Sequence, residues 1–501
     1  MYHPLAFIIL LARLQVVKSL DARAATDYCI LGGGSSGIST AFFLKERGAS
    51  VRILEKDDRL FGKVKNFEAD DGRQYPLGAV LGSTSPGSLL GEMVDRFNIK
   101  MLDIPTTRWI KLPDEIGIFP LPPLSGDILV AIEGYGQATE PYREALSALD
   151  YTNPVLAPIK RMTCLEFLAN NNLLDLYPIF FLLFTAFGYG EMSKVPALYL
   201  LRTYNAESLF GVAVGGSEVA TKVIFFQQML EAMVEGIETH LETNVVGIEH
   251  CDVVDAGDEG YRTLNCRLEG GRSGKKNTKG AKRKKGKRKK GGGKKLKKGS
   301  PSGSDDGTNG MNILHTDTGE DFLCSNVVVA FPPLGDMTFL PFTADQLSIF
   351  RNLRTVDYYS ALSTTERDAS FVNLSPILPN ETLPLEPLVY GNIFPEGLSY
   401  TTSFIQDTSS SSSDAEIKDA MLDADKAAFS STDPALLAFN HWDDYFPYVP
   451  VEDMPGFFEA VEELQGENNV YFVGSFNSME LMRDTLQSGY LFAKKEFTEE
   501  D

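Results

Sequence analysis

Residues 27–55 of the chain, DYCILGGGSSGISTAFFLKERGASVRILE, decide its fold. The apolar run Tyr28–Leu31 predicts a buried strand, the segment from Ile38 to about Arg47 predicts a helix, and Ser50–Leu54 predicts a second strand. The turn between the first strand and the helix fits G-x-G-x-x-G, a pattern typical of a βαβ unit that binds a dinucleotide. An ordinary βαβ turn without a ligand is the alternative interpretation.

Each glycine of this turn has a distinct expected role. Gly32 allows the tight turn from strand to helix, Gly34 lets a pyrophosphate approach the backbone, and Gly37 lets the helix pack close to the sheet. The phosphates would then meet free N–H groups at the positive end of the helix. Glu55 ends the second strand, where its carboxylate can accept hydrogen bonds from both hydroxyls of a ribose, which disfavours a 2′-phosphate.

The length and the N-terminus suggest a large exported protein. The chain has 501 residues, 43% of them apolar, so we expect a large core and two domains. Within residues 1–24, the apolar run Leu5–Ala12 is too short to span a bilayer, and Ala22-Arg23-Ala24 has the small-x-small pattern of signal cleavage. We expect a signal peptide and a secretory or extracellular location. An uncleaved anchor and a disordered extension are the alternatives.

The five cysteines and five histidines show no metal-binding spacing, so we expect no metal. Cys29 lies inside the first predicted strand, and we interpret it as a buried thiol. Cys251 and Cys266 could bridge two neighbouring strands, although an odd total of five leaves the pairing open.

A second glycine-rich segment follows Glu55. Gly62 with Lys63 offers a small residue and a nearby positive charge, as a backbone loop closing over a pyrophosphate requires. A glycine turn beside a solvated lysine is the alternative. The sequence GRQYPLGAVLG then occupies residues 72–82.

With these motifs the chain resembles the flavin amine-oxidase superfamily, whose members follow the glutamate with an R-x-G-G-[RK] loop and an x-x-G-A segment. Within it, the chain is similar to the polyunsaturated fatty acid double-bond isomerases. Their motifs F-T-A-F-G-Y-G, V-P-A-x-Y and W-x-Y-F-P-H-V are matched at residues 184–190, 195–199 and 444–449, the last with Tyr448 replacing histidine. The likeness runs from residue 27 to the C-terminus apart from one insertion. Phe61 stands where the first glycine of the loop belongs, which leaves the path of the loop open.

The resemblance implies an α/β fold with a Rossmann-like FAD-binding domain and a discontinuous substrate or cap domain. The FAD-binding domain would comprise residues 25–85, 224–335 and 465–501, and the cap domain residues 86–223 and 336–464. We expect the FAD to be non-covalent, because no cysteine in the C-terminal segment is placed for attachment.

Further cofactor contacts are implied by matches to superfamily segments. Val245 and Ile248 match a V-x-x-I strand whose valine backbone touches the adenine. Gly474 and Ser475 match a turn against the ribityl–phosphate chain, and Leu481 begins the closing helix that approaches the isoalloxazine. The full set of expected cofactor-binding residues is Gly32, Gly34, Ser36, Gly37, Glu55, Lys56, Gly62, Lys63, Gly78, Ala79, Val245, Gly474, Ser475 and Leu481.

Two residues are candidates for the substrate side of the site. Arg108 falls within a residue of a substrate-gating arginine of the isomerase family, and a fatty acid needs one fixed cation for its carboxylate. Its alternative is a surface arginine. Phe210, with aromatic residues of 184–199, could line a dry tunnel for the hydrocarbon tail, although aromatic side chains usually pack in cores.

A basic insertion at residues 270–310 interrupts the likeness. Residues 272–298 contain sixteen lysines and arginines and no acid, so we expect a disordered loop. The net charge of −21 becomes about −37 without them, since 31 basic residues then face 68 acidic ones. The insertion could contact an anionic surface or fold back on the acidic body. No aromatics interleave with the lysines, so specific nucleic-acid recognition is not expected.

The chemistry implied by the resemblance is isomerisation of a polyunsaturated fatty acid. A bis-allylic hydride would move to flavin N5 and return to a different carbon, giving conjugated double bonds without a protein acid or base. The alternative is an FAD-dependent amine or lipid oxidase or desaturase using oxygen, although no lysine suited to a lysine–water pair near N5 is evident in the sequence. A secreted binding protein without activity is a third interpretation. A nicotinamide-driven reductase is disfavoured, because a second dinucleotide fingerprint is absent. No sequence feature indicates an oligomeric state.

Overall fold

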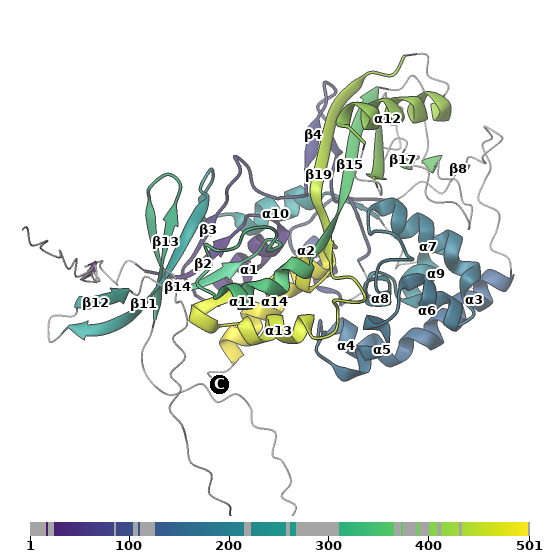
Figure 1. Ribbon diagram of the computed structural model, residues 1–501. Helices are drawn as coiled ribbons and strands as arrows, with labels where there is room; N and C mark the ends of the chain where they lie inside the picture. Colours follow the sequence, from purple (N-terminus) through teal and green to yellow (C-terminus); the bar gives the residue numbers. More distant parts are fainter. Residues whose placement is uncertain are drawn as a thin grey trace, which may run out of the picture.

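The computed structural model describes residues 17–18, 25–84, 87–103, 109–110, 126–214, 222–256, 261–266, 310–364, 372–373, 388–390, 400–407, 412–429 and 433–498. Arg108, most of the expected signal peptide and the basic insertion up to residue 309 lie outside these ranges. The described chain has two halves: one is built on a nine-stranded sheet, and the other on a four-stranded sheet with a lobe of helices beside it (Figure 1).

The nine-stranded sheet has the order β1-β12-β11-β13-β14-β2-β3-β10, and β20 also pairs with β14. Its strands are β1 (Val17–Lys18), β2 (Thr26–Leu31), β3 (Val51–Leu54), β10 (Glu238–His240), β11 (Val245–Ala256), β12 (Tyr261–Cys266), β13 (Met311–Thr316), β14 (Asp321–Val329) and β20 (Val470–Phe472). Strands β10, β3, β2, β14 and β20 are parallel, whereas β11 to β14 pair antiparallel. The βαβ order read from residues 27–55 is therefore present, as predicted.

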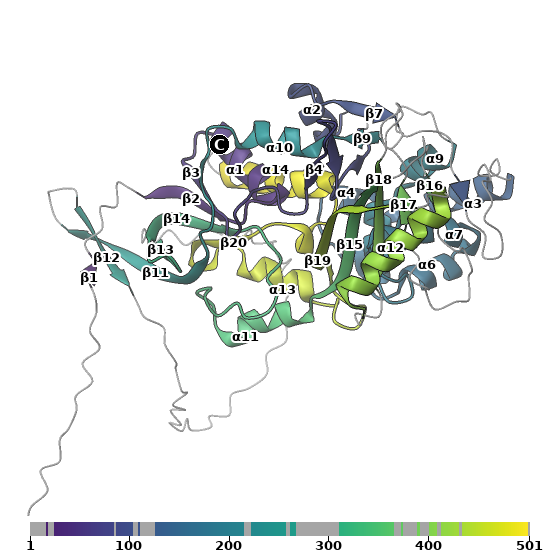
Figure 2. The same cartoon turned by 90° about the horizontal axis from the view of Figure 1, so that it is seen from above.

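Helices cover both faces of the parallel strands, which fits the continuous apolar runs Tyr28–Leu31 in β2 and Val327–Val329 in β14. On one face lie α1 (Ser35–Glu46), α10 (Phe226–Val234) and α14 (Met482–Thr498), packed with Ile30 and Ile53. On the other lies α13 (Phe457–Leu464), packed with Leu31 and Leu54 (Figure 2). Helices α1 and α14 are in direct contact, because a Cβ on Gly489 would lie 2.5 Å from the Thr40 nitrogen.

The second half holds the four-stranded sheet, in the order β17-β18-β15-β19, with α12 across one face (Figure 2). These elements are β15 (Arg354–Thr364), β17 (Leu388–Tyr390), β18 (Tyr400–Asp407), α12 (Asp414–Phe429) and β19 (Leu436–Tyr448). The helical lobe comprises α3 (Gly126–Thr139), α4 (Arg143–Ser147), α5 (Ala157–Lys160), α6 (Cys164–Asn170), α7 (Tyr177–Leu183), α8 (Ala197–Thr203) and α9 (Ala206–Val214).

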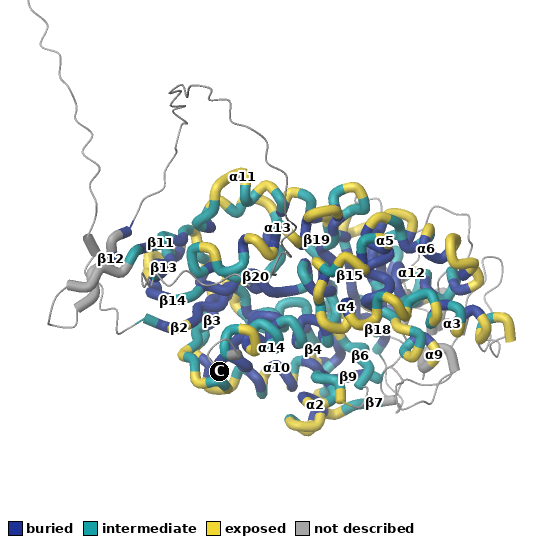
Figure 3. Tube along the Cα trace, turned by 90° about the horizontal axis from the view of Figure 1, so that it is seen from below, coloured by how far each residue is buried: buried dark blue, intermediate teal, exposed yellow. Residues whose placement is uncertain are grey.

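Short elements complete the described structure. They are β4 (Asn66–Glu68), β5 (Gln74–Pro76), β6 (Leu81–Gly82), α2 (Leu89–Arg96), β7 (Met101–Asp103), β8 (Trp109–Ile110), β9 (Lys222–Ile224), α11 (Ala344–Leu347) and β16 (Val372–Asn373). Buried residues fill the centre of both halves, and outer helices such as α11 and α3 carry exposed ones (Figure 3). A buried ionic contact joins the halves, since Arg202 on α8 donates to Asp484 on α14.

The cysteines correct one prediction and confirm another. Cys29 is not a free thiol, because it forms a disulfide with Cys324 on the neighbouring strand β14. The Cys251–Cys266 disulfide is present between β11 and β12, and Cys164 remains a buried free thiol. The described residues contain one group of side chains close enough to hold a metal ion, Glu249 with Cys251 and Cys266, but the disulfide already uses both sulfurs. None of the described helices is long and apolar enough to cross a membrane.

Candidate functional site

The glycine turn leads from β2 into α1 with a geometry that only glycine permits at two positions. Gly32 has a φ of +103°, and a Cβ on Gly37 would collide with the Gly32 carbonyl oxygen. Gly34 precedes the first residue of α1, and a Cβ built on it meets no atom within 4 Å. The space beside Gly34 at the start of α1 is therefore open, and this is where a pyrophosphate would be expected to meet the N–H groups of the first turn.

Glu55 lies beside the glycine turn, at the end of β3. Its carboxylate is buried and accepts hydrogen bonds from the Gly33 N–H at 2.6 Å and the Asp57 N–H at 2.9 Å. These bonds fix the side chain beside the glycine turn and leave lone pairs for hydroxyl donors. The Thr243 N–H donates to the Glu55 carbonyl at 2.8 Å, which brings the segment leading to Val245 to the same edge of the sheet. Lys56, the neighbouring candidate, is exposed.

The loop after β3 lies against the glycine turn despite its departure from the superfamily pattern. Phe61 adopts a φ of +81°, a left-handed conformation that glycine would take without strain. Its N–H donates to the Gly33 carbonyl at 2.8 Å, and a Cβ on Gly62 would lie 3.2 Å from the Gly34 Cα. The loop therefore lies against the glycine turn with Phe61 in a backbone conformation that glycine favours.

Two further segments lie close to the start of α1 and the Gly62–Lys63 loop. The Ala79 N–H donates to the Lys63 carbonyl, and a Cβ on Gly78 would collide with that same oxygen. At the C-terminal end, the Val473 N–H donates to the Val329 carbonyl, and a Cβ on Gly474 would lie 3.7 Å from Ser36 Oγ. The structure thus gathers the glycine turn, the Gly62–Lys63 loop, the Gly78–Ala79 segment and the Gly474–Ser475 turn around the start of α1. We call these four segments the cradle.

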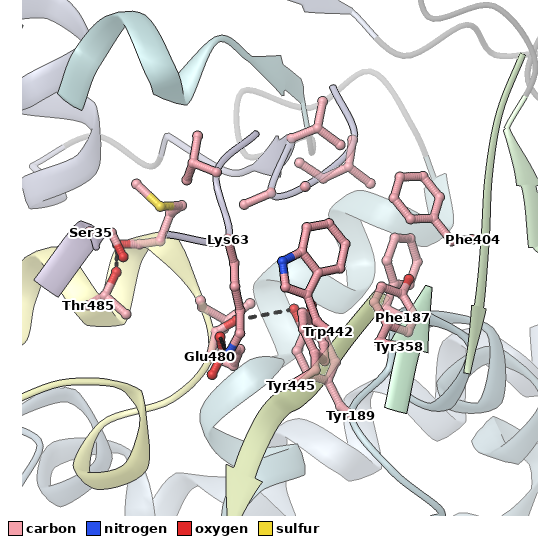
Figure 4. A pocket seen from close by; sticks show the side chains of 17 residues that line it. Ser35, Lys63, Phe187, Tyr189, Tyr358, Phe404, Trp442, Tyr445, Glu480 and Thr485 are labelled. Carbon is pink, nitrogen blue, oxygen red and sulfur yellow. Dashed lines mark hydrogen bonds and ion pairs between the residues drawn. The ribbon is translucent and has the colours of Figure 1, made fainter. Parts of the chain in front are cut away.

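A pocket opens where the cradle meets the second half of the molecule (Figure 4). Its wall is formed by residues from both halves, namely Ser35, Lys63, Val64, Gly78, Ala79, Val80, Leu81, Phe187, Tyr189, Tyr358, Phe404, Trp442, Tyr445, Glu480, Leu481, Met482 and Thr485. Four of the predicted cofactor residues, Lys63, Gly78, Ala79 and Leu481, therefore line one cavity with side chains from β15, β18 and β19.

Aromatic rings form the side of the pocket that belongs to the half with the four-stranded sheet. Tyr358 stacks on Tyr445 with ring centroids 4.5 Å apart and on Phe404 at 6.1 Å, and Tyr189 stacks on Tyr445 at 6.2 Å. Burial raises the pKa of Tyr189, Tyr358 and Tyr445 above the ordinary value, so these phenols stay protonated at physiological pH. The wall is therefore aromatic and uncharged.

Lys63 and Glu480 are the charged side chains among the described lining residues. Lys63 Nζ lies 3.0 Å from Glu480 Oε1 and 3.4 Å from Asp444 Oδ1, and it also donates to the Asp444 carbonyl at 2.8 Å. Burial opposes the charge of Lys63, but the carboxylates of Glu480 and Asp444 outweigh it and raise the lysine pKa. Lys63 is thus a fixed cation whose charge is already balanced.

Of the aromatic residues predicted for the substrate side, Phe187 and Tyr189 line this pocket, whereas the two named candidates are not brought to it by the described structure. Arg108 lies outside the described residues. Phe210 lies on α9 with 45% of its surface exposed and is not among the lining residues. Sequence reasoning missed the residues that do form the wall: Tyr358, Phe404, Trp442 and Glu480. Tyr445 lies in the segment 444–449 that carried the family resemblance, so that segment was the available signal.

The residues present fit a bound FAD. The open start of α1 and the Gly62–Lys63 loop suit the pyrophosphate, and Glu55 suits the adenosine ribose. The pocket beside Gly78, Ala79 and Leu481 lies at the far end of this cradle, where the flavin ring would be expected to meet a substrate.

Comparisons with known proteins agree with this geometry. Residues 30–97 match the model of the NAD(P)-binding Rossmann-like domain. The FAD-dependent oxidoreductase dpchF of Colletotrichum higginsianum is 31% identical over 71 residues, which is 14% of this chain. The matched segment spans only 15% of the length of that curated relative.

Two solved structures are similar over nearly the whole chain. The CLA-producing fatty acid isomerase from P. acnes superposes with a TM-score of 0.68 at 19% identity, covering 94% of this chain and 99% of that one. The cyclohexylamine oxidase from Brevibacterium oxydans gives a TM-score of 0.63 at 16% identity, covering 94% and 98%. At such identities the likeness establishes the fold.

Proposed function

We propose that this protein, whose fold is that of the flavin amine-oxidase superfamily with a Rossmann-like dinucleotide-binding core, is an FAD-dependent isomerase of polyunsaturated fatty acids. It would move a hydride within the substrate and leave conjugated double bonds. The observation that carries the proposal is the wall of the pocket, which is aromatic and whose charged lining residues among those described, Lys63 and Glu480, are paired with each other. Such a wall suits a hydrocarbon chain undergoing hydride transfer, which needs no proton donor.

FAD, when bound, supplies the acceptance and return of the hydride at its ring nitrogen N5. The chain would hold it through the first turn of α1, Glu55, the Gly62–Lys63 loop and the Gly474–Ser475 turn. The stacked rings of Tyr358, Phe404 and Tyr445 would bind the unsaturated chain and exclude water. Arg108 remains our candidate for the cation that binds the substrate carboxylate.

The two carboxylates around Lys63 favour one orientation of the substrate in the pocket. With Glu480 and Asp444 both close to it, Lys63 belongs to a group with a net charge of one negative unit. The carboxylate of a substrate would be repelled by this net negative charge. The fatty acid would therefore place its double bonds against the aromatic wall and its carboxylate away from Lys63.

An FAD-dependent amine or lipid oxidase is the second candidate, and one observation favours it. Lys63 lines the pocket, although no active-site lysine was evident from the sequence, and Glu480 and Asp444 could attract an ammonium group. The fold match to an amine oxidase is consistent with this alternative.

The test uses purified protein with FAD, mixed without oxygen with linoleic, arachidonic or eicosapentaenoic acid. Growth of conjugated-diene absorbance, with the flavin ending in its oxidised form, is the expected result. If no diene forms but an amine panel in air yields hydrogen peroxide, the oxidase alternative replaces the isomerase proposal.

We also propose that the protein works in an oxidising compartment reached by secretion, and that the basic insertion contacts an anionic surface. The two disulfides support the first part, since such bonds persist outside the cytosol. Titration of thiols in the denatured, unreduced protein should then detect only Cys164. Sedimentation with anionic but not neutral vesicles, lost on deletion of residues 272–298, would test the second part.

A further inference from the structure

Glu480 carries a buried oxygen for which the described protein provides no donor. The residue lies between β20 and α14, and its side chain lines the pocket (Figure 4). One carboxylate oxygen, Oε1, pairs with Lys63 at 3.0 Å. The other, Oε2, is buried and has no hydrogen-bond partner among the described residues. A buried carboxylate oxygen without a donor is costly, so its presence in a binding pocket calls for a ligand.

The neighbouring donors are already used elsewhere. The Tyr189 hydroxyl donates to the main-chain carbonyl of Glu480 at 3.4 Å and not to its carboxylate. Lys63 is shared between Glu480 Oε1 and Asp444. A donor for Oε2 would therefore come from whatever occupies the pocket.

We propose that Glu480 Oε2 accepts a hydrogen bond from an N–H group of the bound isoalloxazine ring, and that the contact of Lys63 with Oε1 orients the carboxylate for this bond. The inference rests on the proposed binding of FAD. Hydrogen bonds to an ionised acceptor are roughly twice as strong as neutral ones, so the contact would contribute to cofactor affinity. The same negative charge beside the ring would oppose the gain of negative charge on reduction.

The chain offers a matched control in Asp444. It is the second carboxylate partner of Lys63, but 45% of its side-chain surface is exposed and it does not line the pocket. Glu480→Gln and Asp444→Asn remove the same charge from the same lysine. Only the first changes the acceptor that faces the cofactor.

The experiment measures the Kd of FAD for the apoprotein, the visible spectrum of the bound flavin and its reduction potential. For Glu480→Gln we expect the Kd to rise roughly five- to tenfold, the spectrum to shift and the potential to become more positive. For Asp444→Asn we expect a Kd within about twofold of wild type and an unchanged spectrum. Should Glu480→Gln fail to fold, Glu480→Asp keeps the charge but withdraws the acceptor, and it should weaken FAD binding similarly.

Identical behaviour of the two variants would overturn the inference while leaving FAD binding intact. A raised Kd without a spectral change would also overturn it, by placing the contact on the ribityl chain. An unchanged Kd with a raised KM for an amine would assign Glu480 to an amine substrate instead. If the wild-type protein binds no FAD, the proposed function falls together with this inference.

Discussion

The two halves of the molecule position their functional groups by different means. In the dinucleotide-binding half, backbone atoms form the site: the start of α1 is open, and Gly37 touches the turn so closely that no side chain fits. In the substrate half, side chains form it: Tyr358 and Phe404 come from β15 and β18, which pair across a long sequence separation. A site formed by main-chain atoms tolerates few residue types, whereas in an aromatic wall one aromatic residue can replace another and the wall stays aromatic. The first half should therefore determine whether a cofactor binds, and the second which substrate reacts.

The largest effect should follow from Gly37→Ala. Its Cβ would collide with the Gly32 carbonyl oxygen, and both atoms belong to the main chain, so we expect a loss of at least about 4 kcal/mol in unfolding free energy. Gly34→Ala is the matched control, because its Cβ meets no atom within 4 Å. It should keep the melting temperature and weaken FAD binding. Equal melting temperatures for the two variants would contradict the backbone account.

In the substrate half, the largest effect should come from a buried carboxyl group. Burial raises the pKa of Asp425 to about 7, against the opposing effect of its hydrogen bond from Ser363. The unfolded chain loses this proton near pH 4, so the stability contributed by Asp425 is present below pH 4 and is lost as the pH rises to about 7.

Asp425→Asn should therefore raise the unfolding free energy at pH 8 by about 2–4 kcal/mol, with no gain near pH 4. Denaturation at several pH values measures this difference. Parallel stability profiles for the variant and the wild type would show that Asp425 does not titrate in this window. Because the residue lies on α12 and away from the cradle, FAD affinity should not change.

A smaller effect is expected at Glu55. Glu55→Gln keeps an acceptor for the Gly33 N–H but removes the charge that strengthens bonds from ribose hydroxyls. We expect roughly a tenfold increase in the Kd of FAD, equivalent to about 1.4 kcal/mol. A decrease in affinity for FAD without the same decrease for FMN, which lacks the adenosine, would locate the effect at the ribose. Equal losses for both would contradict this assignment.

The smallest effect should come from the aromatic wall. Trp442→Leu removes one ring of the pocket, and we expect roughly a three- to tenfold loss of kcat/KM with FAD affinity unchanged. Trp442→Phe keeps an aromatic face and should retain most of the activity. A loss of FAD binding in Trp442→Leu would contradict the assignment of cofactor binding to the first half.

The sequence predicts the first half well because its requirements are local. A glycine turn, a terminal acid and a small-residue loop each lie within a few residues of the elements they serve, and the fold class follows from their order. Phe61 shows the limit of such reading, since a pattern alone did not reveal that phenylalanine adopts the left-handed conformation of a glycine.

The second half is less predictable because its contacts are distant in sequence. The position of Phe404 beside Ser360 depends on the register of β15 and β18, which no local motif specifies. The bond between Cys29 and Cys324 joins residues 295 positions apart, so no local pattern around Cys29 indicates its partner. Phe210 has the residue type of a tunnel wall, yet α9 leaves it 45% exposed.

Hydride transfer within the substrate is tested most directly with linoleic acid deuterated at its bis-allylic carbon, incubated without oxygen with the FAD-loaded protein. We predict a conjugated product that retains deuterium at a new carbon, with the flavin oxidised at the end. Absence of the conjugated product, with a flavin that stays reduced until oxygen is admitted and then yields peroxide, would contradict it and identify an oxidase.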